Sequence, residues 1–282
     1  MAWKEYNKFR TEHLYLLFDK VKQETMSVHL PNELFKLINE IDPKGIEVKG
    51  EQKAFACSMY PLVKLSSWKG NPLPISKIKE LWGYSPKNKS LNELVKSGGH
   101  LDKHGITRTV GATKVQRKEP ALDDDPKKGF FKLNPEIMLF SMFESEKIGT
   151  IGFTIYIFLC KETQMQGKGK NIAETALTYI ALGTGLHRNT VEKYIKVLEK
   201  IGLIYVIRGD SIHNGEYGEF KNETNKYRIN HQFNAFAYYN AGTITNESKD
   251  ELSLYEQKQE AEVVSNPTFF DMGGDDLSWL YD

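Results

Sequence analysis

The sequence is poor in the residues that mark disulfide-bonded, membrane-spanning or metal-binding proteins. It has two cysteines, Cys57 and Cys160, and each lies in an apolar helical pattern. This usage predicts buried free thiols in an intracellular protein rather than a disulfide or a metal site. No apolar run approaches the roughly 20 residues that cross a bilayer, and the N-terminal residues lack the apolar core of a signal peptide. We therefore expect a cytoplasmic chain with no membrane partner.

Sequence motifs for catalysis and cofactor binding are missing as well. The GKGK run at 167–170 has neither the spacing nor the hydroxyl residue of a phosphate-binding loop. The seven histidines are scattered, and no Gly-x-Ser-x-Gly motif occurs. Three aspartates at 123–125 have no partnering ligand pattern, which favours a solvated loop. These absences predict a protein without enzymatic activity, cofactor or bound metal.

The net charge of +1 conceals two regions of opposite sign. Residues 247–282 carry ten acidic and two basic residues, a net charge of −8, which leaves 36 basic and 27 acidic residues, or +9, in residues 1–246. A basic body can attract phosphates. A solvated surface with a solubilising tail would give the same totals.

A short motif is repeated. Leu198–Leu203, LEKIGL, echoes Leu101–Ile106, LDKHGI, 97 residues earlier. The preceding segments also match, because Val28–Leu34 and Phe131–Ile137 are each predicted to be a short strand that ends near a proline and leads into a helix. This self-similarity predicts a duplicated unit, from 27 to 129 and from 130 to 231.

The predicted elements follow the same order in both units. An apolar helix, at 54–65 and 151–160, precedes a helix that ends in a left-handed glycine turn, at Gly83 and Gly185. A second helix, a strand and a long polar excursion follow. We expect Phe130–Asn134 and Lys226–Asn230 to form the closing strands, with Phe130–Asn134 also opening the second unit.

Residues 177–208 carry the main binding prediction, a helix, a tight turn and a second helix before a strand. The second helix should bury Val191, Ile195, Leu198 and Ile201 and expose His187, Arg188, Asn189, Thr190, Glu192, Lys193 and Lys196. Helix-turn-helix proteins place the start of the second helix in the major groove. We expect Arg188 and Asn189 to contact bases, and Lys193 and Lys196 to contact phosphates. An ordinary helical hairpin with a charged face is the alternative.

The polar excursions and the first unit add further candidates. The glycines of 208–225 permit a hairpin from which Arg208, His213 and Lys221 could reach DNA, although three glutamates reduce its positive charge. The excursion of the first unit is more basic, with Arg108, Lys114, Arg117 and Lys118. Lys87, Asn88 and Lys89 begin its second helix, which Gly98 and Gly99 should shorten, break or kink, at about 1 kcal/mol each relative to alanine. Trp82 is expected to fill core.

The second unit, from GFFKLNPEIM at 129–138 to NKYRIN at 225–230, resembles winged-helix domains of replication-initiation and primosomal proteins of plasmids and phages of Gram-positive bacteria. The run TGLHRNTVEKYIKVLEKIGLI at 184–204 carries the resemblance and is shared with many transcription regulators. The resemblance implies an α+β, mainly helical fold with two tandem winged-helix domains, as in two-domain plasmid initiators.

Regions outside the repeat complete the expected organisation. Residues 1–26 are predicted to form an amphipathic helix that packs on the first domain or on a second copy in a homodimer. The domains are expected at 27–129 and 130–246, and the acidic tail, 247–282, is expected to be disordered. Two tail segments combine acids with apolar anchors suited to a partner, namely Leu252, Leu254 and Tyr255, and Leu277, Trp279 and Leu280. The first is similar to the pentapeptide by which bacterial replication proteins dock on the sliding clamp, with Glu251 in place of the usual glutamine. The alternative is a tail that packs on the body or competes with DNA.

Together these patterns predict a sequence-specific protein that binds double-stranded DNA, a plasmid or phage replication initiator that recruits host replication proteins. Two alternatives remain open from the sequence. One is a transcriptional regulator that uses the same contacts, and the other is a winged-helix adaptor that does not bind DNA.

Overall fold

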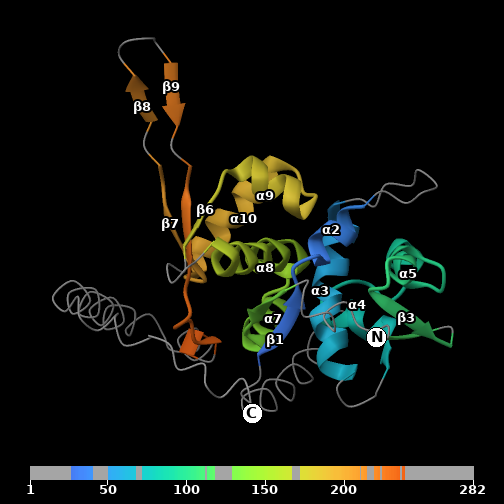
Figure 1. The fold of residues 1–282 in the computed structure, drawn as a ribbon. Coiled ribbons are helices and arrows are strands. Elements are labelled where there is room, and N and C mark those ends of the chain that lie inside the picture. Colours follow the sequence, from blue (N-terminus) through green and yellow to red (C-terminus); the bar gives the residue numbers. More distant parts are fainter. Residues whose placement is uncertain are drawn as a thin grey trace, which may run out of the picture. The chain divides into compact units, whose positions relative to one another are not determined.

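The computed structural model describes residues 27–40, 50–67, 72–111, 113–117, 129–166, 172–209, 211–214, 219–222, 224–235 and 237–238. Contacts group the chain into two units, Met1–Phe233 and Asn234–Asp282, and the elements below belong to the first. The fold is α+β, with helices and small antiparallel sheets (Figure 1). The predicted N-terminal helix, the three aspartates and the acidic tail lie outside the described residues. No described helix is both long and apolar enough to span a membrane.

Two segments of the chain have the same order of elements. We call them module 1, residues 50–117, and module 2, residues 149–229. Module 1 contains α3 (Gly50–Ser67), β2 (Leu73–Pro74), α4 (Ile75–Leu81), α5 (Lys89–Val95), α6 (His100–Lys103), β3 (Thr107–Val110) and β4 (Lys114–Arg117). Module 2 contains α8 (Gly149–Gln166), β6 (Ile172–Glu174), α9 (Leu177–Thr184), α10 (Arg188–Ile201), β7 (Ile204–Ile207), β8 (Ser211–Asn214), β9 (Glu219–Asn222) and β10 (Lys226–Ile229).

The sheets of the two modules have the same topology. Each is antiparallel with three strands, in the order β2-β4-β3 in module 1 and β6-β10-β7 in module 2. In both, the last strand of the module lies in the middle, between the strand that precedes the helix pair and the strand that follows it. In module 2 the β8–β9 hairpin is inserted in the chain between β7 and β10 (Figure 1).

The repeated six-residue motif has the same structure in both modules. Its leucine, Leu101 or Leu198, is fully buried. Its glycine adopts a left-handed conformation, with φ of 72° at Gly105 and 86° at Gly202. An extended strand follows, so the motif ends a helix on a buried leucine and turns the chain directly into the sheet.

The helix of module 1 that precedes this motif is broken, as the sequence predicts. The chain leaves α5 at Lys96, Gly98 has a φ of 68°, and α6 begins at His100. In module 2 the corresponding segment is one continuous helix, α10, of 14 residues.

A strand and a helix precede each module, also as predicted. β1 (Val28–Pro31) leads into α2 (Leu34–Asn39), and β5 (Phe130–Leu133) leads into α7 (Pro135–Phe143). The prediction that Phe130–Asn134 closes the first unit is wrong. β5 pairs with β1, and β4 takes the closing position because its register with β3 places buried Val115 opposite Thr109.

The long helices α3 and α8 pack against each other in the middle of the first unit (Figure 1). Most of their residues are buried on all sides, including Phe55, Met59, Phe153 and Ile157. A helix that is apolar all round must be covered on every face. The two modules therefore share one core through these helices.

Candidate nucleic-acid interface

The helix pair of module 2 is joined by a tight turn of three residues. Gly185 ends α9 with a φ of 68°, Leu186 is buried, and His187 caps α10 by accepting a hydrogen bond from the Asn189 backbone N–H at 3.3 Å. His187 is therefore the N-cap residue of α10. The left-handed glycine ends α9 and turns the chain within a few residues.

The two faces of α10 differ in burial. Val191, Ile195 and Leu198, spaced four and three residues apart, are at most 4% exposed and pack on the module core. Ile201, also expected inside, is half-buried. The exposed face carries His187, Arg188, Asn189, Lys193 and Lys196, with Thr190 half-buried beside them. The predicted contact residues thus lie together on one helix.

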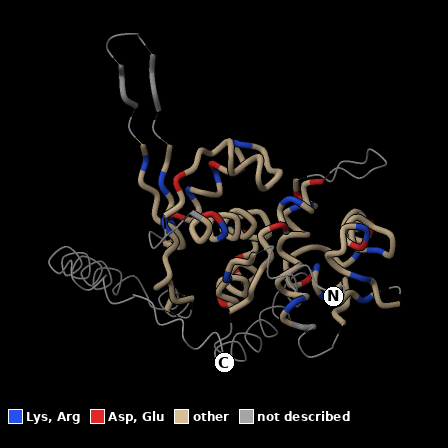
Figure 2. The backbone as a smooth tube through the Cα atoms, in the orientation of Figure 1, with Lys and Arg blue, Asp and Glu red and all other residues tan. Residues whose placement is uncertain are grey.

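Acidic residues on and near α10 neutralise part of its charge (Figure 2). Glu192 accepts a hydrogen bond from Lys196 at 2.9 Å. The Lys196 ammonium, and to a lesser degree Arg188, lowers the pKa of the Glu192 carboxyl. Because solvent reaches both side chains, the pair contributes little to stability. A phosphate could replace Glu192 as the partner of Lys196 at small cost.

Arg208 follows β7 and returns to α10. Its guanidinium donates two hydrogen bonds to Glu199, at 3.0 and 2.6 Å. The same carboxylate raises the pKa of Arg208. A bidentate pair fixes the orientation of the guanidinium plane, so Arg208 links the base of the hairpin to α10.

The predicted excursion of module 2 forms a hairpin. β8 and β9 pair from Ser211 opposite Asn222 to Asn214 opposite Glu219. Asn225 supports the base of the hairpin, since its side-chain oxygen accepts from the Gly209 N–H at 3.4 Å and its amide donates to the Tyr227 hydroxyl at 3.2 Å. The predicted contact residue Lys221 lies on β9. The structure describes its backbone and not its side chain.

The corresponding surface of module 1 is smaller. Lys87 and Lys89 are exposed, and Asn88 caps α5 by accepting from the Leu91 N–H at 3.4 Å. Arg108 and Lys114 are exposed on β3 and β4. Arg117 ends β4, and Lys118 lies outside the described residues. The predicted cations are therefore divided between the start of α5 and the β3–β4 hairpin.

A buried lysine that the sequence analysis did not single out supports the turn of module 1. Lys79 on α4 is 1% exposed, and its ammonium donates to the carbonyl oxygens of Pro86 and Asn88 and to the side-chain oxygen of Asn92 at 2.9 Å. Burial lowers the pKa of Lys79. This lysine holds the loop that precedes α5, and nothing in the local periodicity distinguishes it from a solvated lysine.

The end of α2 and module 1 also contact the end of α9 and the turn that follows it. The Asn39 amide donates to the Gly183 carbonyl oxygen at 2.6 Å. A Cβ on Gly185 would lie 2.4 Å from Oδ1 of Asn39 and 2.5 Å from Cδ of Lys53, and Lys53 is buried. An ammonium near the end of α9 also suits the negative pole of the helix dipole. These contacts fix the turn that orients α10.

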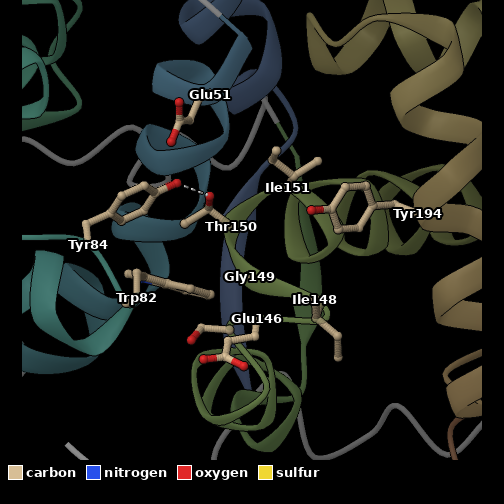
Figure 3. Close-up of a pocket in the computed structure, with 11 residues that line it drawn as sticks. Glu51, Trp82, Tyr84, Glu146, Ile148, Gly149, Thr150, Ile151 and Tyr194 are labelled. Atoms are coloured by element: carbon tan, nitrogen blue, oxygen red, sulfur yellow. Dashed lines mark hydrogen bonds between the residues drawn. The ribbon is translucent and has the colours of Figure 1, made fainter. Parts of the chain in front are cut away.

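A pocket of about 250 Å³ lies between the two modules behind α10 (Figure 3). The rings of Trp82, Tyr84 and Tyr194 and the carboxylates of Glu51 and Glu146 contribute to its lining. Burial raises the pKa of Tyr84 to about 12, so its hydroxyl stays protonated and bonds to Oγ1 of Thr150 at 2.7 Å. The lining includes no lysine or arginine.

Comparison of the chain with protein-family models, with curated proteins and with solved structures finds no match in any of the three. Within the described residues, no group of three or more histidine, cysteine or acidic side chains could hold a metal ion. Cys57 and Cys160 are buried free thiols, and burial raises the pKa of both, that of Cys160 to about 12. The predicted partner anchors of the tail, residues 252–255 and 277–280, lie outside the described residues.

Proposed function

We propose that the chain binds double-stranded DNA through two tandem winged-helix modules, with α10 as the principal reading helix. The single observation that carries the proposal is the polar, cation-rich face at the start of α10. This face stands on a helix pair that is followed by a strand and a hairpin, the arrangement in which such helices enter the major groove.

The contacts divide into two kinds. Arg188 and Asn189 begin the helix, where side chains reach base edges, and their groups suit guanine and adenine. Lys193 and Lys196 lie one and two turns further along and suit phosphates, which set register without sequence information. Module 1, with its broken helix and basic hairpin, contributes mainly contacts to the phosphates of the DNA backbone.

We further propose that the bound DNA is a plasmid or phage replication origin and that the acidic tail recruits a host replication protein, with no catalysis by this chain. The motif at 184–204 supports this role through its resemblance to replication-initiation domains. A transcriptional regulator is the second candidate, because regulators share the same motif. A minimal plasmid whose replication depends on this gene would separate the two roles.

An adaptor that does not bind DNA is the third candidate, and the broken α5–α6 helix favours it for module 1. Equilibrium binding to DNA from the native locus and to random DNA, at two salt concentrations, distinguishes the adaptor from the DNA-binding protein. Several phosphate contacts predict a steep fall in affinity as salt rises. Retention of full affinity by an Arg188→Ala, Lys193→Ala double variant would refute the assignment of α10.

A further inference from the structure

The two strands that precede the modules pair in a symmetrical way. The sequence match makes Val28 equivalent to Phe131 and Leu30 equivalent to Leu133. In the structure Val28 pairs with Leu133, and Leu30 pairs with Phe131. Replacing each residue of the first pair by its equivalent gives the second pair. A contact in which the same surface meets itself is isologous, and it implies a two-fold rotation between the two copies.

The central helices follow the same rule. The Ser58 hydroxyl on α3 donates to the Thr150 carbonyl oxygen at 3.3 Å, and the Thr154 hydroxyl on α8 donates to the Ala54 carbonyl oxygen at 3.1 Å. As one helix advances from 54 to 58, its partner goes back from 154 to 150, so the helices cross in antiparallel sense. Each helix donates one bond to the other.

A third pair of contacts links each module to the turn of the other. Tyr84, at the turn after α4, bonds to Thr150 at the start of α8. Conversely, Gly50 at the start of α3 lies against the turn after α9, since a Cβ on Gly50 would be 3.3 Å from the Gly185 carbonyl oxygen and 3.3 Å from the Leu186 side chain. Tyr84 and Leu186 both follow the turn glycine, so the turn of each module lies against the beginning of the other module's long helix.

We propose that the modules form a pseudo-dimer within one chain, related by an approximate two-fold rotation, and that one chain contacts two DNA half-sites in inverted orientation. This inference rests on the proposed DNA binding. Operator symmetry mirrors protein symmetry, so modules related by a two-fold axis meet a duplex as an inverted pair. A head-to-tail arrangement of modules would instead contact direct repeats.

The half-sites are unequal in this arrangement. α10 is continuous and presents Arg188 and Asn189, whereas the equivalent start of α5 presents Asn88 and Lys89 on a helix that ends after seven residues. Base sequence at the module 2 half-site is therefore tightly specified, and at the module 1 half-site only loosely. Because the modules share a core, the distance between half-sites is fixed.

DNA cleavage by an iron chelate attached to the protein measures the orientation of each module on the duplex. The method does not require the two half-sites to match in sequence. Four single-cysteine variants carry an iron chelate, at the reading helices (Lys89→Cys and Asn189→Cys) and at the hairpins (Thr113→Cys and Asn214→Cys). The native thiols are buried. A duplex selected by the unmodified full-length chain from a random pool serves as the probe. Sedimentation of the complex counts the chains on each duplex.

The proposal predicts one chain on each duplex and cleavage positions in a mirror order, hairpin–helix–helix–hairpin or helix–hairpin–hairpin–helix. An alternating order of hairpin, helix, hairpin and helix would overturn it, as would cleavage from only one module or two chains on each site. These results would leave DNA binding by α10 intact. If no duplex binds even at low salt, both the proposed function and this inference fail.

Discussion

The Gly185→Ala substitution tests whether Asn39 of α2 and Lys53 of α3 hold the turn of the module 2 helix pair. A non-glycine residue in the left-handed conformation costs about 1–2 kcal/mol. The added methyl group would also lie 2.4 Å from Oδ1 of Asn39 and 2.5 Å from Cδ of Lys53. Overpacking costs about 1–3 kcal/mol, and the lower end applies because both obstructing atoms belong to side chains. We expect a total loss of about 2–4 kcal/mol in the free energy of unfolding.

Gly202→Ala is the matched control. Gly202 also has a left-handed conformation, with a φ of 86°, but a Cβ there meets no atom within 4 Å. Only the backbone cost applies, so we expect a loss of about 1–2 kcal/mol. Urea denaturation of both variants, with an unchanged m-value, gives the difference.

A second substitution assigns that difference to the contact. In an Asn39→Ala background, part of the excess loss of Gly185→Ala should disappear, because neighbouring substitutions are not additive. Equal losses for Gly185→Ala and Gly202→Ala would show that Asn39 and Lys53 do not constrain the turn.

Four further predictions concern single residues and the acidic tail. Burial and nearby lysines lower the pKa of His29. Below a pH of about 6.5 the unfolded chain therefore binds more protons than the native chain, so the free energy of unfolding decreases as the pH is lowered. His29→Phe should reduce that decrease in urea titrations. Thr154→Val removes a buried hydrogen bond between α8 and α3, and should cost about 1 kcal/mol by the same assay, with a neutral result contradicting its role. Cys160 should resist a thiol reagent in the native protein and react after unfolding, since burial raises its pKa to about 12; rapid native labelling would contradict its burial. Deletion of residues 247–282 should leave DNA affinity equal or higher, and a large loss in a gel-shift titration would contradict a tail that acts only in recruitment.

The local elements of module 2 could be predicted from the sequence. Helical spacing identified Val191, Ile195 and Leu198 as buried, and Gly185 was identified as the left-handed turn. The broken helix of module 1 followed from Gly98 and the motif after it. These features depend on residues within one or two helical turns of each other, which periodicity and turn chemistry capture.

Contacts between segments that lie far apart in the sequence could not be predicted in the same way. Asn39 reaches Gly183 across 144 residues, and β1 pairs with β5 across about 100. The strand at Phe130–Asn134 has the same alternating pattern whichever partner it takes, so the sequence could not exclude its assignment as a closing strand. Lys79 resembles a surface lysine until the fold places three oxygen atoms around its ammonium.

The salt dependence of DNA affinity tests whether the chain binds DNA through α10. The unmodified chain is compared with Arg188→Ala, Lys193→Ala and with a control, Lys132→Ala, Lys147→Ala, which removes the same charge from exposed positions outside α10. We predict that the logarithm of affinity falls steeply with the logarithm of salt for the unmodified chain and the control. The α10 variant should bind more weakly, with a slope reduced by about 1 for the lost phosphate contact. Equal affinities and slopes for the two double variants would contradict DNA binding through α10.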